Sequence, residues 1–282
     1  MKKNVKKKYS FFSLFLRIIV YAAAFITLAV VVLLLGYIVV KGLPNLSPKL
    51  FEWEYNSQNV TLMPALINTL MITVLAMLIA TPIGVFSAIY LNEYAKKGNR
   101  FISVIRLAAE TLSGIPSIVY GLFGMIFFVI TLGWGYSLLA GAFTLAIMIL
   151  PLIMRTTEEA LMSVPDLYRE GSYGLGAGKL RTVFAIVLPS AIPGILSGII
   201  LSIGRIVGET AALIFTAGTL AQIPNSPFGS ARTLAVHMYS LSSEGLYLEE
   251  TYATSLVLLI LVIIINYTSE FLAKRMVKKR NG

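Results

Sequence analysis

The sequence predicts an all-α polytopic membrane protein with about six transmembrane helices, each of roughly 20 residues or more. Three observations support this prediction: 57% of the 282 residues are hydrophobic, only 13% are charged, and long apolar runs recur along the chain. Soluble domains contain about 25% charged residues. The apolar runs are continuous and lack the alternation of a membrane β-barrel, so strands are not expected.

Each predicted span is an apolar run long enough to cross about 30 Å of hydrocarbon. The first run follows a basic start and could be a signal peptide. However, Ile18–Val40 carries no charge over roughly 23 residues, whereas the apolar part of a signal peptide has about 7 to 15. We therefore expect it to remain as an anchor. The spans are predicted at about 13–40, 64–91, 103–132, 136–155, 190–218 and 251–272.

Lysine and arginine residues are concentrated at one set of span ends. The basic segments 1–12 and 273–282 flank the first and last spans, and further basic residues lie between spans two and three and between spans four and five. The positive-inside rule then predicts that both termini are cytoplasmic in a multi-pass protein of the inner or plasma membrane. Contact with anionic membrane lipid accounts for the net charge of +10, and nucleic acid is not expected as a partner.

The composition also limits the chemistry that the chain can perform. It has no cysteine and one histidine, which excludes a disulfide framework and any thiolate or two-histidine metal site. His237 is expected to be a solvated or capping side chain in the outer loop 219–250. A membrane-embedded enzyme would need several catalytic groups at one depth, and these are missing. We predict no catalytic residue, no metal and no cofactor, and therefore no enzyme.

The segment 156–189 is the longest predicted cytoplasmic connection, and it contains the glycine-rich stretch GLGAGK. A phosphate-binding loop would need glycine at Tyr173 and a hydroxyl residue at Leu180, and a dinucleotide-binding loop would need glycine at Lys179. A nucleotide site is therefore not expected. The pair Pro165–Asp166 favours a helix start, and the glycines favour its end. A short helix followed by an amphipathic return to the membrane is predicted.

The spacing within this segment resembles the signature of the membrane subunits of binding-protein-dependent ABC importers. That signature has Glu followed by two small residues, then Gly, and finally Ile-x-Leu-Pro. The resemblance implies a type I ABC importer permease fold in which the segment is a coupling helix that docks on an ATPase. The residues alone also allow an ordinary amphipathic connector. The matching residues are Glu170, Gly171, Ser172, Gly176, Ile186, Leu188 and Pro189, with Gly171 and Ser172 where the family usually has alanine.

Three further stretches resemble the permeases of phosphate-specific ABC importers, and their sequences are similar to the PstA type. They are Leu112–Gly124, Leu150–Pro165 and Gly204–Gly218, with Ala212 where proline is usual. The resemblance implies phosphate as substrate, a homologous second permease of the PstC type and an extracytoplasmic phosphate-binding protein. It also implies two copies of a cytoplasmic ATPase subunit, which would hydrolyse the ATP. A permease for sulfate or molybdate is the alternative.

Two charged residues lie inside the predicted fifth span. Arg205 and Glu209 are four residues apart and are therefore expected on one helix face. A charge at mid-bilayer costs about 2.5 to 3.5 kcal/mol, so it faces protein or a watery cavity. The pair either fixes helix packing or lines an anion path, because a guanidinium suits phosphate oxygens. The resemblance favours the path. Arg106 and Glu110 repeat this spacing near the interface, where a packing role is expected.

Overall fold

A computed structural model describes residues 11–56, 59–96 and 98–281, and this part of the chain contains no β-strand. The prediction of an all-α protein is confirmed. The predicted basic terminus 1–12 lies almost entirely outside the described residues. The elements are α1 (Phe11–Gly42), η1 (Leu43–Asn45), η2 (Pro48–Phe51), α2 (Met63–Ile89), η3 (Tyr90–Tyr94), α3 (Arg100–Ser113), α4 (Ser117–Gly124), η4 (Met125–Thr131), α5 (Leu138–Met162), α6 (Asp166–Gly174), α7 (Lys179–Thr182), η5 (Val183–Val187), α8 (Leu188–Val207), α9 (Ala211–Ile214), α10 (Leu234–Glu244) and α11 (Leu248–Asn281).

The membrane-crossing helices follow the order of the predicted spans, but the third span is bent and the limits of the fourth and fifth differ. Among the described residues, five helices are long and apolar enough to cross a membrane, or six if one bent pair counts as a span. The bent pair is Arg100–Ser113 with Ser117–Thr131, and its two parts meet at 103°. The stretch 103–132 is therefore not one straight helix. Gly114 lowers helix propensity and Pro116 removes a backbone donor, so the helix breaks between them.

The fourth and fifth spans have different limits from those predicted. Helix α5 continues to Met162, beyond the predicted end at 155, because no proline or glycine interrupts it there. The fifth span runs over Lys179–Val207, and it therefore begins before the predicted position 190 and ends before 218. Much of the predicted connection 156–189 thus extends the two spans. Residues 273–281 likewise continue α11 as helix.

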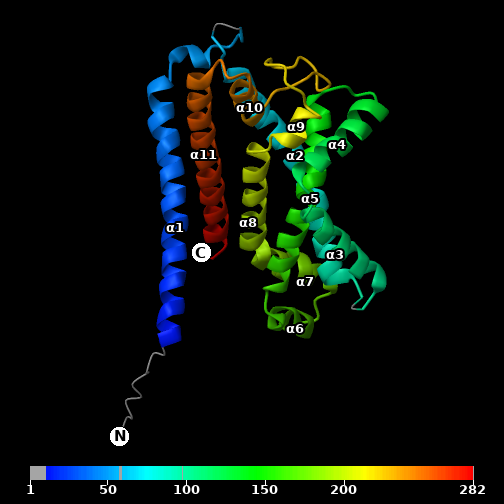
Figure 1. Cartoon of the computed structure of the whole chain (residues 1–282). Coiled ribbons are helices and arrows are strands. Elements are labelled where there is room, and N and C mark those ends of the chain that lie inside the picture. Colours follow the sequence, from blue (N-terminus) through cyan, green and yellow to red (C-terminus); the bar gives the residue numbers. More distant parts are fainter. Residues whose placement is uncertain (1–10, 57–58, 97, 282) are drawn as a thin grey trace.

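Helix α5 is the centre of the bundle. Within its most apolar stretch 67% of the residues are buried, against none for α1. Helices α2 and α8 both pack on α5, whereas α1 packs against α11, and Figure 1 shows α1 and α11 side by side at one edge. The main core lies where α2, α5 and the segment around α9 meet, and it includes Ile72, Leu145, Ile149, Ile153 and Leu213.

Glycines allow the helices around α5 to approach closely. A Cβ atom on Gly84 of α2 would lie 2.8 Å from Ile153 Cγ2, and one on Gly198 of α8 would lie 2.6 Å from Thr156 Cβ. Contacts between carbon atoms are favourable only near 3.5 to 4.0 Å. The two helices can therefore lie this close to α5 only because the side chains are missing.

The two ends of the bundle differ in structure. Helix α6 lies at one end, which we call the coupling end, and α1 begins and α11 finishes toward it (Figure 1). The segments 43–56, 59–62 and 208–233 lie at the other end, which we call the far end. Helix α10 joins the far end to α11 and packs on both α2 and α11.

The expectation that His237 is solvated is wrong. His237 is 0% exposed. It lies in α10, and its ring centroid is 6.2 Å from that of Tyr55. The Arg232 guanidinium lies 5.0 Å from the same Tyr55 ring. Burial, together with the nearby Arg232 charge, lowers the pKa of His237 from 6.5 to about 3. The imidazole is therefore neutral at pH 7.

Candidate functional site

Helix α6 presents one face to the bundle and the other to the surroundings. Leu167 is 74% exposed, Glu170 is exposed, and Leu175, directly after the helix, is 91% exposed. Arg169 and Ser172 are three residues apart and point the other way, into the protein. Large apolar side chains that remain this exposed on a short helix indicate a contact surface for another protein.

The two small residues of the signature have different surroundings. Gly171 is exposed, and a Cβ atom there would meet nothing within 4 Å. Ser172 is 4% exposed, and its hydroxyl lies 2.8 Å from Thr182 Oγ1 in α7. Only position 172 therefore needs a small residue for close packing. Gly176 follows the helix with φ of +80°, a conformation that glycine adopts without strain.

The remaining signature residues lie on the return path to the membrane. Ile186 belongs to the π-helical turn η5, and Leu188 and Pro189 open α8. All three are partly buried. Proline is tolerated in the first turn of a helix because its missing N–H would have no helical partner there. The signature therefore spans one continuous unit, from the exposed face of α6 to the start of α8.

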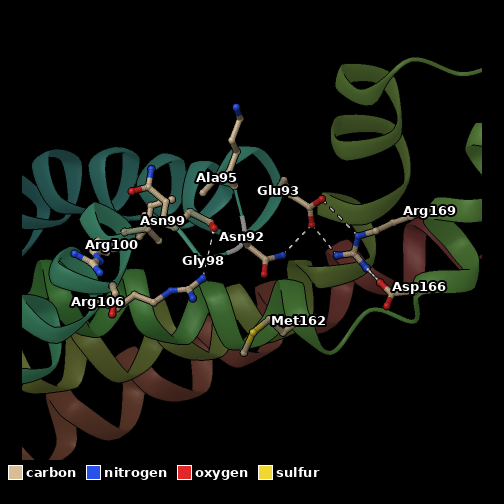
Figure 2. Close-up of a pocket in the computed structure, with 14 residues that line it drawn as sticks. Asn92, Glu93, Ala95, Gly98, Asn99, Arg100, Arg106, Met162, Asp166 and Arg169 are labelled. Carbon is tan, nitrogen blue, oxygen red and sulfur yellow. Dashed lines mark hydrogen bonds and ion pairs between the residues drawn. The ribbon is translucent and has the colours of Figure 1, made fainter.

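An ion pair that sequence analysis missed connects α6 to the end of α2. The Arg169 Nη2 donates to Glu93 Oε1 at 2.7 Å, and Nε donates to Oε2 at 3.5 Å (Figure 2). This hydrogen bond to the Glu93 carboxylate raises the pKa of Arg169, which also donates to Asp166 at 3.2 Å. The two residues are 76 positions apart, so no local spacing could reveal the pair. The only signal was an acidic residue at the end of an apolar run.

The pair borders a cavity of about 820 Å³ at the coupling end. Figure 2 shows Glu93 and Arg169 directed toward each other, with Asn92 beside them. Two of the other cations that line the cavity, Arg100 and Arg106, lie away from this pair, so these guanidinium groups do not converge with Arg169 on one point. The cavity therefore lacks the clustered charges of a tight anion site.

Arg205 borders a second cavity, of about 880 Å³, between α5, α8 and α11. Asn266 and Glu270 of α11, four residues apart, and Ser197 of α8 also line it. The Glu270 carboxylate is held by Lys274 at 2.6 Å, and none of the ion pairs among the described residues involves Arg205. The guanidinium therefore borders a roomy space that contains polar groups, as an anion path requires.

The expectation that Arg205 and Glu209 share a helix face is wrong. Helix α8 ends at Val207, with Gly208 at its C-terminal cap, so Glu209 lies outside the helix. The Glu209 carboxylate accepts a hydrogen bond from the backbone N–H of Ala212 at 3.1 Å. It therefore acts at the start of α9, where a negative charge is favourable, and the i, i+4 argument does not apply to it.

The second predicted pair, Arg106 and Glu110, is also replaced by other contacts. Arg106 forms an ion pair with Glu158 of α5, and no ion pair to Glu110 occurs among the described residues. Arg106 also donates to the Leu91 carbonyl at 3.4 Å. The contact joins α3 to α5 and fits the packing role that was expected, although through another carboxylate. No group of three or more metal-ligating side chains occurs in the described part of the chain.

Comparison with known proteins assigns a family to this architecture. The family model described as "Binding-protein-dependent transport system inner membrane component" matches residues 80–281. The probable ABC transporter permease protein YqgI of Bacillus subtilis is 36% identical over 274 residues, which cover 91% of this chain and 93% of that protein. The phosphate transport system permease protein PstA of Mycobacterium leprae is 38% identical over 205 residues, 72% of this chain and 67% of that protein.

Solved structures show the same fold. A chain of a bacterial alginate ABC transporter, solved in complex with its periplasmic protein, has a TM-score of 0.66 at 16% identity, covering 93% of this chain and 96% of that one. A chain of the inward-facing MetNI methionine transporter has a TM-score of 0.59 at 20% identity, covering 76% and 93%. The fold is that of type I ABC importer permeases. The chain belongs to the inner-membrane components of binding-protein-dependent transport systems, which are permease subunits and not enzymes.

Proposed function

We propose that this chain is the membrane-spanning permease subunit of an ATP-driven phosphate importer and forms half of its translocation path. The observation that carries the proposal is the position of Arg205, a cation that forms none of the ion pairs among the described residues and that borders a cavity of about 880 Å³ lined by α5, α8 and α11. The 38% identity to a phosphate permease supports phosphate as the anion. A guanidinium binds tetrahedral oxyanions through two parallel N–H···O bonds.

The partners follow from the same proposal. A second, homologous permease of the PstC type completes the path, and two ATPase subunits dock at the coupling end. The exposed face around Leu167, Glu170 and Leu175 supports this docking site, because its apolar side chains have no cover within the chain. Both termini then lie on the cytoplasmic side. A phosphate-binding protein delivers the anion at the far end.

In this proposal Arg205 and Glu209 have separate roles and do not form an ion pair with each other. Arg205 faces the anion, and Glu209 holds the first turn of α9 through the Ala212 N–H at 3.1 Å. Glu209 still lies close to Arg205 along the chain and contributes negative potential near the path. Removal of its charge therefore affects the path through position and potential, and not through a broken ion pair.

Phosphate uptake by the reconstituted importer tests the proposal. The Arg205→Ala variant should abolish uptake while the permease keeps its membrane abundance and still co-purifies with the ATPase. The Arg205→Lys variant should restore uptake poorly, since an ammonium cannot form the two parallel bonds. Near-normal uptake by Arg205→Ala would show that this residue only packs the bundle. Sulfate or molybdate that competes better than phosphate would identify the importer as one for another oxyanion.

Docking is tested separately at Glu170. Its side chain is exposed and lies outside the five apolar spans, so Glu170→Lys should leave the spans inserted. The reversed charge should nevertheless prevent co-purification with the ATPase, because like charges across an interface are strongly unfavourable. Normal ATPase recovery with this variant would place the docking surface elsewhere.

A further inference from the structure

Arg169 lies where the coupling helix α6 meets the ends of two long helices. Its guanidinium donates to the carbonyl groups of Leu161 at 3.0 Å and Val164 at 2.9 Å, at the end of α5. It also binds Glu93, at the end of α2, at 2.7 Å. The Arg169 side chain is 15% exposed and that of Glu93 is 6% exposed, so water screens the charges weakly. One side chain therefore connects α6 with both α5 and α2 (Figure 2).

The two connections are not equivalent. Helix α6 follows α5 after a short turn, so the chain itself holds these helices together. The packing of α6 is mainly against α7 and η5. The end of α2 is 76 positions away in sequence and reaches α6 through the Glu93 carboxylate. The ion pair is therefore the contact that fixes α6 to α2.

A π-helical turn and a neighbouring amide position the Glu93 carboxylate for its contact with Arg169. Helix α2 ends in the π-helical turn η3, which contains Glu93, and the Asn92 amide donates to its Oε1 at 2.9 Å. A π-helical turn changes the direction of side chains at a helix end and is frequent at functional sites. A carboxylate this buried is stable in its charged form only beside a partner. Glu93 and Arg169 therefore hold one another in a single arrangement.

We propose that the Glu93–Arg169 pair is a rigid joint that carries movement of the coupling helix into α2. This inference rests on the proposed function, in which α6 follows the ATPase. Helix α2 packs along α5, and α5 packs along α8, which carries Arg205 at the cavity. A displacement of the end of α2 therefore reaches the helices around the anion path. Glu93 and Arg169 are positioning residues, and neither lines the cavity at Arg205.

The first test measures how much phosphate the reconstituted importer takes up for each ATP hydrolysed. Glu93→Gln keeps the size of the side chain and leaves Arg169 on the α5 carbonyl groups. The ATPase should still co-purify and hydrolyse ATP, while uptake per ATP falls about tenfold, within the usual range of coupling between sites. Glu93→Asp keeps the charge and should recover part of the ratio. Loss of ATPase docking together with uptake would indicate a purely structural role and overturn the joint.

A matched control is available at the same end of the protein. Arg155 and Glu159 form an exposed i, i+4 pair at 3.1 Å, with both side chains 58% exposed. Exposed pairs of this kind contribute little, so Glu159→Gln should leave uptake per ATP unchanged. An equal fall in Glu159→Gln and Glu93→Gln would mean that any charge loss at this end has the same effect, and the proposal would be wrong.

The second test follows the joint directly, first with the ion pair intact and then with Glu93→Gln added. The chain has no cysteine, so spin labels can be attached to Tyr90→Cys and Tyr168→Cys, at side chains that are 58% and 52% exposed. The distance between the labels should stay the same with and without ATP, and should change with ATP when Glu93→Gln is added. A change with ATP in the unmodified pair would overturn the joint. This measurement needs no transport, so it remains decisive even if phosphate proves not to be the substrate.

Discussion

Arg169 and Arg205 are both half-buried arginines, but they differ in the partners that surround them. At the coupling end, Arg169 binds a carboxylate at 2.7 Å and two backbone carbonyl groups, and it joins three segments. At the cavity, Arg205 lies near the end of α8 beside a space of about 880 Å³ and takes part in none of the ion pairs formed by the described residues. A satisfied arginine fixes neighbouring elements in one arrangement, whereas an unpaired one is available to a ligand.

Spacing of i, i+4 in the sequence does not by itself predict which charged residues form ion pairs. The i, i+4 pairs Arg205/Glu209 and Arg106/Glu110 both failed to form, although Arg155 and Glu159, with the same spacing, do pair at 3.1 Å. Spacing places two residues on one face only while the helix continues. Even then, a carboxylate from another helix can lie closer, as Glu158 does for Arg106.

The largest expected effect comes from filling the packed face of α8 and not its open face. A Cβ atom at Gly198 would lie 2.6 Å from Thr156 Cβ, whereas one at Gly204 would meet only Asn266 Oδ1, at 3.8 Å. Gly198→Val should therefore destabilise the protein by about 3 kcal/mol, the upper end of ordinary overpacking. Gly204→Val should be tolerated. Thermal unfolding in detergent measures both, and equal losses would show that α8 has no open face.

The second effect concerns His237, which is buried at the far end near the positive charge of Arg232. Its pKa is about 3 in the folded state and 6.5 when free. As the pH falls below 6.5, the unfolded state binds a proton first, so the folding stability is full above that pH and declines toward pH 3. The expected slope is about 1.4 kcal/mol per pH unit. His237→Gln should flatten this part of the profile, and an unchanged slope would contradict the burial argument.

The third effect concerns the inward face of the coupling helix. Ser172→Ala introduces the residue that is usual in the family but removes the 2.8 Å contact with Thr182 Oγ1. A buried hydrogen bond contributes about 1 kcal/mol, so unfolding should become easier by roughly that amount. Thr182 keeps its bond to the Gly178 carbonyl at 3.2 Å, which limits the loss. A measured gain in stability would show that the hydroxyl contact contributes nothing.

The smallest effect is a gain on the outward face of the same helix. Gly171→Ala adds a methyl group where nothing lies within 4 Å, and alanine favours a helix over glycine by up to about 1 kcal/mol. The variant should therefore be slightly more stable and should still bind the ATPase. Gly176→Ala is the control with the opposite sign, since φ of +80° costs a residue with a Cβ atom about 1 to 2 kcal/mol. A loss of stability in Gly171→Ala would mean that the backbone there is not helical.

Most of the fold could be predicted because it follows from local properties. The length of the apolar runs determines which segments can cross a membrane, and the spacing of Glu170, Gly176 and Pro189 matches the signature from which a coupling segment was predicted. The limits of the spans were less certain. Nothing in hydropathy distinguishes the polar last turns of α5 from a connection, and Gly114 and Pro116 do not by themselves give the 103° angle between the two parts of the third span.

The sequence by itself therefore determined the helical class, the number of apolar spans to within one span, and the segment that carries the family signature, because each depends on residues close together in the chain. Only the tertiary structure decided which charges meet. Glu93 and Arg169 are separated by 76 positions and come together through the packing of α2 and α6 around the end of α5. Glu209 is close to Arg205 in sequence but is turned away by the end of α8 at Val207. Charge partners are chosen by three-dimensional distance and burial, and these depend on the whole bundle.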